Sequence, residues 1–235
     1  MRLIFSAFLL LLTMQVNAEQ STSPLSSIRV TGQSTITANP DRAQIDIGVE
    51  THALQSSAAA TQNATRLTAA LAALRKAVGS SGEIKTASYS LNAEYEFHPN
   101  GTRTLTGYVA NNIVHITLND LSKVGGVIDA ATDAGANEVQ DIRFTLSDQQ
   151  TVRAQALREA VLRAKADAGV LASALDLKVL RILAVESSDG GGPFQHIVPM
   201  ARSIAAAKAP TPIEPGTIEV TANVTLTVEV GAAAR

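Results

Sequence analysis

The chain has 235 residues, of which 46% are hydrophobic and 17% are charged, with no cysteine and a formal net charge of −2. The absence of cysteine excludes disulfide bonds, a thiolate nucleophile, a cysteine metal site and a lipid anchor on cysteine, so the hydrophobic core alone must hold the fold. The near-neutral balance, without any lysine- or arginine-rich cluster, argues against a nucleic-acid partner.

The N-terminus has the three parts of an export signal. Met1 and Arg2 precede an apolar run from Leu3 to Leu12, which is shorter than the roughly 20 residues that span a bilayer. Val16 and Ala18 then supply the small residues that a signal peptidase requires. We therefore predict a signal peptide over residues 1–18, cleaved after Ala18, and an uncleaved N-terminal anchor is the alternative.

Residues 19–27 are a polar, Ser/Thr-rich stretch, which predicts a linker because it cannot bury enough apolar surface to order itself. The export signal predicts a periplasmic protein, and peripheral association with the outer membrane is the other location that fits. Residues 28–235 are expected to form one domain, since a mature chain of about 215 residues can bury a sizeable core.

Alternating patterns predict two β-hairpins in the first half of this domain. Apolar residues alternate with polar ones from Ile28 to Val49, on both sides of the turn Asn39-Pro40-Asp41, which predicts the first hairpin. Two long β-like runs, 84–97 and 104–118, are joined through Asn-Gly, the dipeptide typical of a tight hairpin turn. Between the hairpins, the spacing of leucine and valine over 67–78 predicts an amphipathic helix.

Two further helices are predicted in the second half. Asp120 can cap a helix over 121–134, and a short strand follows at 139–146. Ser147 and Gln150 have the spacing of a capping box, which predicts a third helix from there to Leu175. On this helix alanine recurs every fourth residue, and larger apolar residues broaden the stripe: Ala156, Ala160, Ala164 and Ala168, with Val152, Val161, Leu171 and Leu175.

Two final strands complete the fold class. Residues 179–185 predict one strand, and the strict alternation of apolar and polar residues over 218–230 predicts another with one buried face. The element order predicts an α+β fold, an antiparallel or mixed β-sheet with three main helices packed on it in a two-layer sandwich.

An extended loop over 187–217 separates these two strands and is too long for a simple connection. Its tail is rich in proline, but its middle is apolar and would be exposed unless something covered it. These apolar residues are a candidate oligomer interface: Phe194, Ile197, Val198, Met200 and Ile204. The alternative is that they fold back onto their own sheet.

Aromatic residues gather on the long hairpin predicted over 84–118. They form a candidate binding surface, with core or cross-strand packing as the alternative: Tyr89, Tyr95, Phe97 and Tyr108. Glu94 and Glu96 lie on one face of the same predicted strand. A solvated face explains them better than a glycosidase pair, which needs two carboxylates held across a cleft.

Motifs for catalysis and metal binding are missing from the sequence. It contains neither Gly-x-Ser-x-Gly nor Ser-x-x-Lys, and its histidines (His52, His98, His115 and His196) lack the spacing of a helical zinc pair. The glycines 190–192 run into Pro193 without the lysine of a phosphate-binding loop. We therefore predict no catalytic residue, no cofactor and no metal, and a protein that is not an enzyme.

A series of short motifs, in this order and spacing, resembles the SIMPL-domain family over about residues 28–230. The motifs are Val30-Thr31-Gly32, Asn39-Pro40-Asp41, Ile47-Gly48-Val49, Ile84-Lys85-Thr86, Leu105-Thr106-Gly107-Tyr108 with Asn112, Asp120-Leu121, Gly135-Ala136-Asn137 and the alanine-rich 156–168. The resemblance implies an α+β domain, an envelope location and assembly into homo-oligomers. Members include periplasmic or outer-surface immunogenic proteins and oxidative-stress-defence proteins, and the family supplies no catalytic residues to transfer.

Three hypotheses about function follow. The first is a non-enzymatic envelope protein that self-assembles into a scaffold and supports envelope integrity or oxidative-stress tolerance indirectly. The second is a periplasmic module that binds a ligand or client through the hairpin aromatics or the long loop. The third is an enzyme without a recognisable motif.

Overall fold

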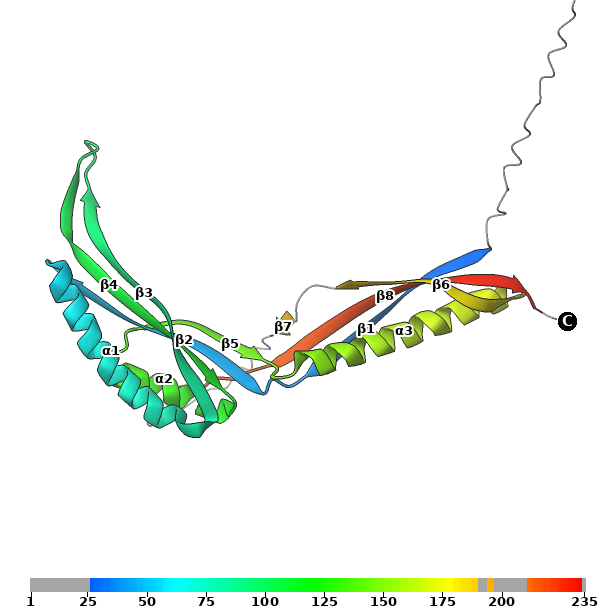
Figure 1. Cartoon of the computed structure of the whole chain (residues 1–235), viewed down its shortest axis with the longest axis horizontal. Coiled ribbons are helices and arrows are strands. Elements are labelled where there is room, and N and C mark those ends of the chain that lie inside the picture. The colour runs from blue at the N-terminus through cyan, green and yellow to red at the C-terminus, as the bar shows by residue number, and fades with distance from the viewer. Residues whose placement is uncertain (1–25, 190–193, 197–210, 234–235) are drawn as a thin grey trace, which may run out of the picture.

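The computed structural model describes residues 26–189, 194–196 and 211–233. The predicted α+β class, with three helices packed on antiparallel strands, is confirmed, and the strands are divided between two sheets (Figure 1). The elements are β1 (Ser27–Ala38), β2 (Arg42–Ala53), α1 (Ser56–Val78), β3 (Gly82–Phe97), β4 (Arg103–Leu118), α2 (Val124–Asp133), β5 (Glu138–Thr145), α3 (Gln149–Ala174), β6 (Leu177–Asp189), β7 (Phe194–His196) and β8 (Thr217–Ala232).

Each sheet belongs to a lobe with its own core. The insert lobe contains β2 to β5 in the sheet order β3-β4-β2-β5, together with α1 and α2. The terminal lobe contains the sheet β1-β8-β6, the short β7 paired with β8, and α3. The two lobes lie end to end and give an elongated molecule (Figure 1).

The predicted hairpin between 28 and 49 is wrong. β1 pairs with β8 in the terminal lobe, whereas β2 pairs with β4 and β5 in the insert lobe. Asn39-Pro40-Asp41 therefore carries the chain from one sheet to the other. Alternation with a period of two shows that a segment is a strand with one buried face, but it does not identify the partner strand.

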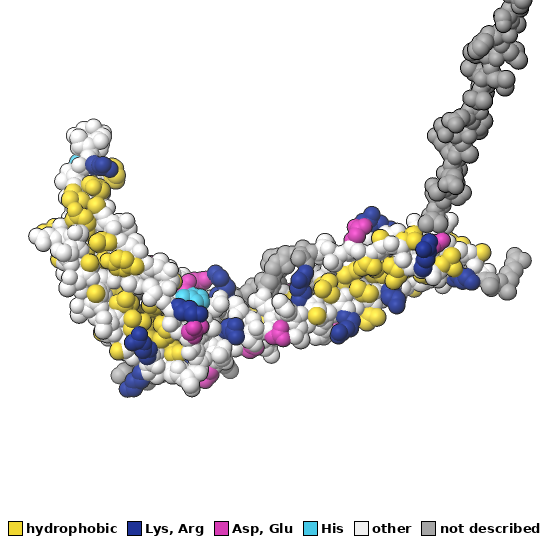
Figure 2. All heavy atoms as spheres, viewed as in Figure 1, with side chains coloured by type: hydrophobic (Ala, Val, Ile, Leu, Met, Phe, Trp, Pro, Cys, Tyr) yellow, Lys and Arg dark blue, Asp and Glu magenta, His cyan; other side chains and the backbone are white. Residues whose placement is uncertain are grey.

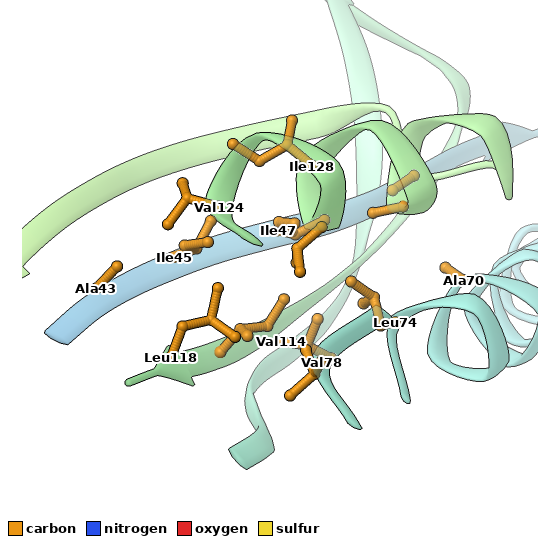
Figure 3. Close-up of a cluster of buried hydrophobic side chains, with 14 of the residues drawn as sticks. Ala43, Ile45, Ile47, Ala70, Leu74, Val78, Val114, Leu118, Val124 and Ile128 are labelled. Carbon is orange, nitrogen blue, oxygen red and sulfur yellow. The ribbon is translucent and has the colours of Figure 1, made fainter. Parts of the chain in front are cut away.

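The insert lobe buries one face of its sheet beneath two helices. Ile45 and Ile47 of β2 belong to one buried cluster with Leu74 of α1 and Ile128 of α2 (Figure 3). The predicted helix over 67–78 is confirmed and begins earlier, at Ser56, and the predicted Asp120 cap accepts a hydrogen bond from the Ser122 amide at 3.2 Å. The predicted long hairpin of β3 and β4 is also confirmed.

The terminal lobe is built on the predicted alanine stripe. Ala156, Ala160, Ala164 and Ala168 are all buried against β1 and β8, and every second residue of β8 from Ile218 to Val230 is buried with them. Small side chains allow the helix to approach the sheet closely, and Gly32 of β1 lies directly beneath it. Two of the predicted flanking residues do not join this core, since Leu171 is 45% and Leu175 62% exposed.

The predicted capping box of α3 is wrong. Asp148, one residue later, caps the helix by accepting from the Thr151 amide at 3.0 Å. Two segments connect the lobes, one between β1 and β2 and one between β5 and α3. Ser147 lies in the second, and its amide and hydroxyl donate to the carboxylate of Asp41 in the first at 2.6 and 2.5 Å. These hydrogen bonds join the two connecting segments and therefore stabilise the junction between the lobes.

Replacing Asp41 with alanine should destabilise this junction in a pH-dependent way. The Ser147 hydroxyl holds the pKa of Asp41 below its usual value of 3.8, so the charged form stabilises the fold above that pH. This stabilisation is lost as the pH falls through the lowered pKa. Because Asp41 is exposed, we expect a loss of about 1 kcal/mol at pH 7 in urea unfolding.

The matched control for this prediction is Glu96→Ala, which removes an exposed carboxylate from the far end of the insert lobe. It should leave the unfolding midpoint within error of the wild type. Equal stability of the Asp41 variant and the wild type at pH 7 would contradict the proposed junction.

Strands occupy part of the segment 187–217 that was predicted to be a loop. β6 continues to Asp189, and Phe194 begins β7, whose backbone pairs with Thr217–Glu219 of β8. Ile197, Val198, Met200 and Ile204 lie outside the described residues, as does the predicted signal peptide. Within the last part of this loop, Thr211 donates from its amide and hydroxyl to Asp129 of α2 at 3.2 and 2.6 Å. In the described part of the chain, no helix is both long and apolar enough to cross a membrane.

Candidate functional site

The outer half of the β3–β4 hairpin projects beyond the rest of its sheet (Figure 1). β4 pairs with β2 only from Tyr108 to Leu118, whereas it pairs with β3 as far out as Arg103. At the tip, Gly101 adopts a φ of +82°, which glycine tolerates best, and the Asn100 side chain accepts from the Thr102 amide at 3.0 Å. Residues 94–107 therefore form a two-stranded arm beyond the end of β2.

One face of the β3–β4 hairpin is apolar and open to solvent. By strand alternation it continues the buried face of the sheet past the end of α1, so the helix does not cover it. We define the hairpin face as Tyr89, Leu91, Tyr95, Phe97 and Leu105, which are 53%, 39%, 39%, 76% and 47% exposed. Hydrophobic side chains run along the arm in Figure 2.

The structure brings three of the four predicted surface aromatics onto the hairpin face. Tyr89, Tyr95 and Phe97 are exposed rather than packed in the core, while Tyr108 is half-buried beside Ala53 and Ala93. The guanidinium of Arg103 lies 4.7 Å from the centre of the Tyr95 ring, a cation–π distance. A contiguous exposed apolar face of this kind typically marks an interaction site.

The opposite face of the insert sheet is polar. His52 of β2 contacts Glu50 through Nε2 at 3.1 Å and Glu94 of β3 through Nδ1 at 3.3 Å. Nearby, the Asn111 amide donates to Glu138 at 2.8 Å. Glu94 therefore belongs to an ion-pair network on a solvated face, which agrees with the sequence interpretation of that residue.

His52 should titrate above its usual pKa of 6.5, because hydrogen bonds to Glu50 first and to Glu94 second favour its protonated form. The resulting stabilisation is present below about pH 6.5 and is lost as the pH rises through the raised pKa. An NMR titration of the imidazole should show the raised value in the wild type.

Glu50→Gln should then lower the His52 pKa, whereas Glu83→Gln should leave it unchanged, since Glu83 instead pairs with Lys85 at 2.9 Å. An identical titration of His52 in the wild type and in Glu50→Gln would show that the contact is absent in solution.

Two other histidines named from the sequence, His98 and His115, lie apart from each other and from His52. His98 bonds to the Thr104 hydroxyl at 3.0 Å near the hairpin tip, and His115 contacts Asp46 at 2.6 Å. Among the residues that the structure describes, no group of three histidine or acidic side chains could hold a metal ion.

A second apolar surface was missed by the sequence reasoning. The edge strand β6 exposes Val179, Leu180, Ile182 and Val185 at 39%, 51%, 47% and 59%. Its nearly continuous apolar sequence favours a strand buried on both faces. Two register shifts against β8 break the alternation, and α3 lies over β1 and β8 instead, so the β6 side chains remain open.

Comparisons with known proteins agree with the sequence motifs. The model of the SIMPL family, described as a protein of unknown function (DUF541), matches residues 28–228. The 26 kDa periplasmic immunogenic protein of Brucella melitensis is 27% identical over 170 residues, 71% of this chain and 68% of that protein. YggE of Escherichia coli K12 is 26% identical over 183 residues, 78% of this chain and 73% of that protein.

Among solved structures, AtUAH in complex with glyoxylate matches 56% of this chain and 34% of that chain with 15% identity and a TM-score of 0.24, which carries no argument. The family match, in contrast, spans both lobes, from β1 to β8. The chain belongs to the SIMPL family.

Proposed function

We propose that this protein is a non-enzymatic periplasmic envelope protein that assembles with copies of itself into a scaffold. The single observation that carries the proposal is the hairpin face, an apolar surface on an arm that extends away from the insert lobe core. Burying apolar surface of this kind against a second copy would stabilise the assembly, because the hydrophobic effect scales with the area removed from water.

The sheet edges support assembly as well. β1 and β6 form the two edges of the terminal sheet, and β3 and β5 form those of the insert sheet. Open edges present backbone donors and acceptors that another strand can pair with, and the β6 edge also carries exposed apolar side chains. The predicted oligomer interface comes shortly after β6 in the sequence. It comprises Phe194, Ile197, Val198, Met200 and Ile204.

The periplasmic location rests on two independent supports. The sequence predicts a signal peptide that is cleaved after Ala18. The Brucella melitensis relative is named a periplasmic immunogenic protein. Peripheral association with the outer membrane fits the same proposal.

Any contribution to oxidative-stress tolerance is indirect in this proposal. The chain contains no cysteine and only three methionines, of which Met1 and Met14 lie in the predicted signal peptide. The remaining Met200 offers little capacity to scavenge an oxidant. A structural role in the envelope accounts for such tolerance without redox chemistry in the protein itself.

A second candidate function is the binding of a client protein or ligand by the monomer. The same hairpin face favours it, because exposed aromatic side chains are typical of binding surfaces. The two functions differ in the partner: a second copy in the first, a different molecule in the second.

Variants of residues 19–235 test the proposal and locate its interface. The first changes Tyr95, Phe97 and Leu105 to serine, and the second changes Phe194, Ile197 and Met200 to serine. Light scattering coupled to size exclusion should show a large assembly for the wild type and a single chain for the hairpin variant. If the predicted loop interface contributes, the second variant also falls in mass.

The matched control changes Leu162 and Val170 to serine, since these two residues of α3 are 58% and 67% exposed but lie outside both surfaces. Its mass should equal that of the wild type. A hairpin variant that keeps the full assembled mass would overturn the interface proposed here.

A further inference from the structure

A pocket of about 550 Å³ lies at the junction of the two lobes. Strands β2 and β5 of the insert lobe contribute most of its lining, and the terminal lobe adds Gln149 at the start of α3 and Ile218 at the start of β8. The volume is within the range of sites that hold small organic ligands, and such sites often lie between domains. The residues described in β3 and β4 do not line this pocket, so it is separate from the hairpin face.

The register of β2 and β5 gathers hydrogen-bond donors on one wall of the pocket. Arg42 lies opposite Thr145, and Gln44 lies opposite Arg143. All four are on the solvent side of the sheet, because the residues between them on each strand belong to the buried core of the insert lobe. Arg42 and Arg143 are diagonal neighbours, a relation in which backbones are roughly 7–8 Å apart, so their long side chains can reach the same ligand.

Both arginines keep donors that the protein does not use. Arg42 forms no ion pair among the described residues, and its Nε donates to Oδ1 of Asn119 at 3.3 Å, which leaves its Nη atoms available. Arg143 uses Nη2 on Asp141 at 2.8 Å and retains its other N–H groups, and its side chain is 64% exposed. Together the two guanidinium groups favour an anion as the ligand.

The carboxylates near this wall have partners of their own and do not line the pocket. Asp41 accepts from Ser147, Asp46 contacts His115 at 2.6 Å, and Asp141 compensates one of the two guanidinium charges. A single guanidinium charge is therefore left without compensation. One carboxylate group matches that charge, whereas a phosphate dianion would add a second negative charge beside three aspartates.

We propose that this pocket binds the carboxylate group of a small organic acid. Arg42 and Arg143 donate to its two oxygens, because the planar fork of a guanidinium group matches the geometry of a carboxylate. Leu146 and Ile218 add apolar atoms to the lining, and since they are 7% and 3% exposed, the hydrocarbon part that they contact is short. The site depends neither on the hairpin face nor on self-assembly.

Isothermal calorimetry on residues 19–235 tests the site with three probes. Butyrate should bind at low ionic strength, and its affinity should fall as sodium chloride is added, because salt screens the charges. n-Butylammonium, which has the same chain and the opposite charge, should give no heat beyond dilution, and inorganic phosphate should bind at least tenfold more weakly than butyrate. Phosphate that binds as tightly as butyrate would overturn the choice of a carboxylate, and an absence of heat with butyrate would overturn the site.

Variants connect the heat to the two arginines. Arg42→Gln and Arg143→Gln should each weaken butyrate at least tenfold, because each removes one of the two charged donors. The Arg143 side chain is 64% exposed, so its variant tests the site even if Arg42→Gln disturbs the junction of the lobes. Unchanged affinity in Arg143→Gln would contradict the site.

The matched control is Arg75→Gln, which removes the same charge from an exposed position on α1 outside the pocket. It should bind butyrate as the wild type does, and an equal loss of affinity in this variant would show that the heat reflects net charge alone. The mass of Arg143→Gln by light scattering should equal that of the wild type. The loss of the ligand site and the loss of assembly are therefore separate results.

Discussion

Gly32→Ala should strongly destabilise the terminal lobe. A Cβ at Gly32 would lie 2.1 Å from the carbonyl oxygen of Ala160 and 2.5 Å from the amide nitrogen of Ala164. Both are backbone atoms of α3, so no side-chain rotation can relieve the clash and the helix must move away from β1. We expect a loss of about 3 kcal/mol in the free energy of unfolding.

The control for Gly32→Ala is Gly169→Ala, in the same lobe. A Cβ at Gly169 meets no atom within 4 Å, and alanine favours a helix over glycine by up to about 1 kcal/mol. The control should therefore be neutral or slightly stabilising in urea unfolding followed by circular dichroism. If Gly32→Ala is as stable as Gly169→Ala, the close approach of α3 to β1 does not exist in solution.

The second large effect is expected at Leu74, in the other lobe. Its side chain is fully buried between α1 and the sheet, within the core of the insert lobe (Figure 3). Leu74→Ala removes contacts on all sides and leaves a cavity, which should cost about 3 kcal/mol. The matched control is Leu54→Ala, at a leucine that is 84% exposed, and its effect should stay within about 0.5 kcal/mol.

Tyrosine fluorescence distinguishes the two lobes in these experiments. The chain has no tryptophan, and all three tyrosines (Tyr89, Tyr95 and Tyr108) lie in the insert lobe. Leu74→Ala should shift the fluorescence transition, while Gly32→Ala should shift mainly the circular dichroism. A single coincident transition that moves equally in both variants would show that the two cores unfold as one unit.

The elements were predictable from the sequence where local patterns determine them. The Asn-Gly turn encodes the long hairpin, and the alternation over 218–230 encodes β8 with its single buried face. Alanine at every fourth position likewise identified the face of α3 that is buried against the sheet. In each case the signal and the structure lie in the same short segment, so no knowledge of distant contacts was needed.

Strand partners and caps were less predictable, because they depend on residues far apart in the chain. The partner of β1 is β8, close to the C-terminus, and the alternation of Ile28 and Val30 is the same for either partner. The sequence around Ser147 is typical of a helix cap, but its amide and hydroxyl donate hydrogen bonds to Asp41, in the segment between β1 and β2. Asp148 caps α3 instead.

The candidate surfaces were predictable only in part. The sequence identified Tyr89, Tyr95 and Phe97, but their exposure depends on where α1 ends over the sheet. The packing of α1 on the sheet also involves the buried Asn63, whose amide protons bond to two different strands. A single asparagine in an alanine-rich helix carries no sequence signal for that arrangement.

The solution mass of wild-type residues 19–235, measured by light scattering across a range of concentrations, tests the central claim most directly. We predict a defined multiple of the single-chain mass that persists on dilution, because the hairpin face and the β6 edge would both be covered by neighbouring copies. A single-chain mass at every concentration would contradict the self-assembling scaffold and would favour a monomer that binds a different partner through its hairpin.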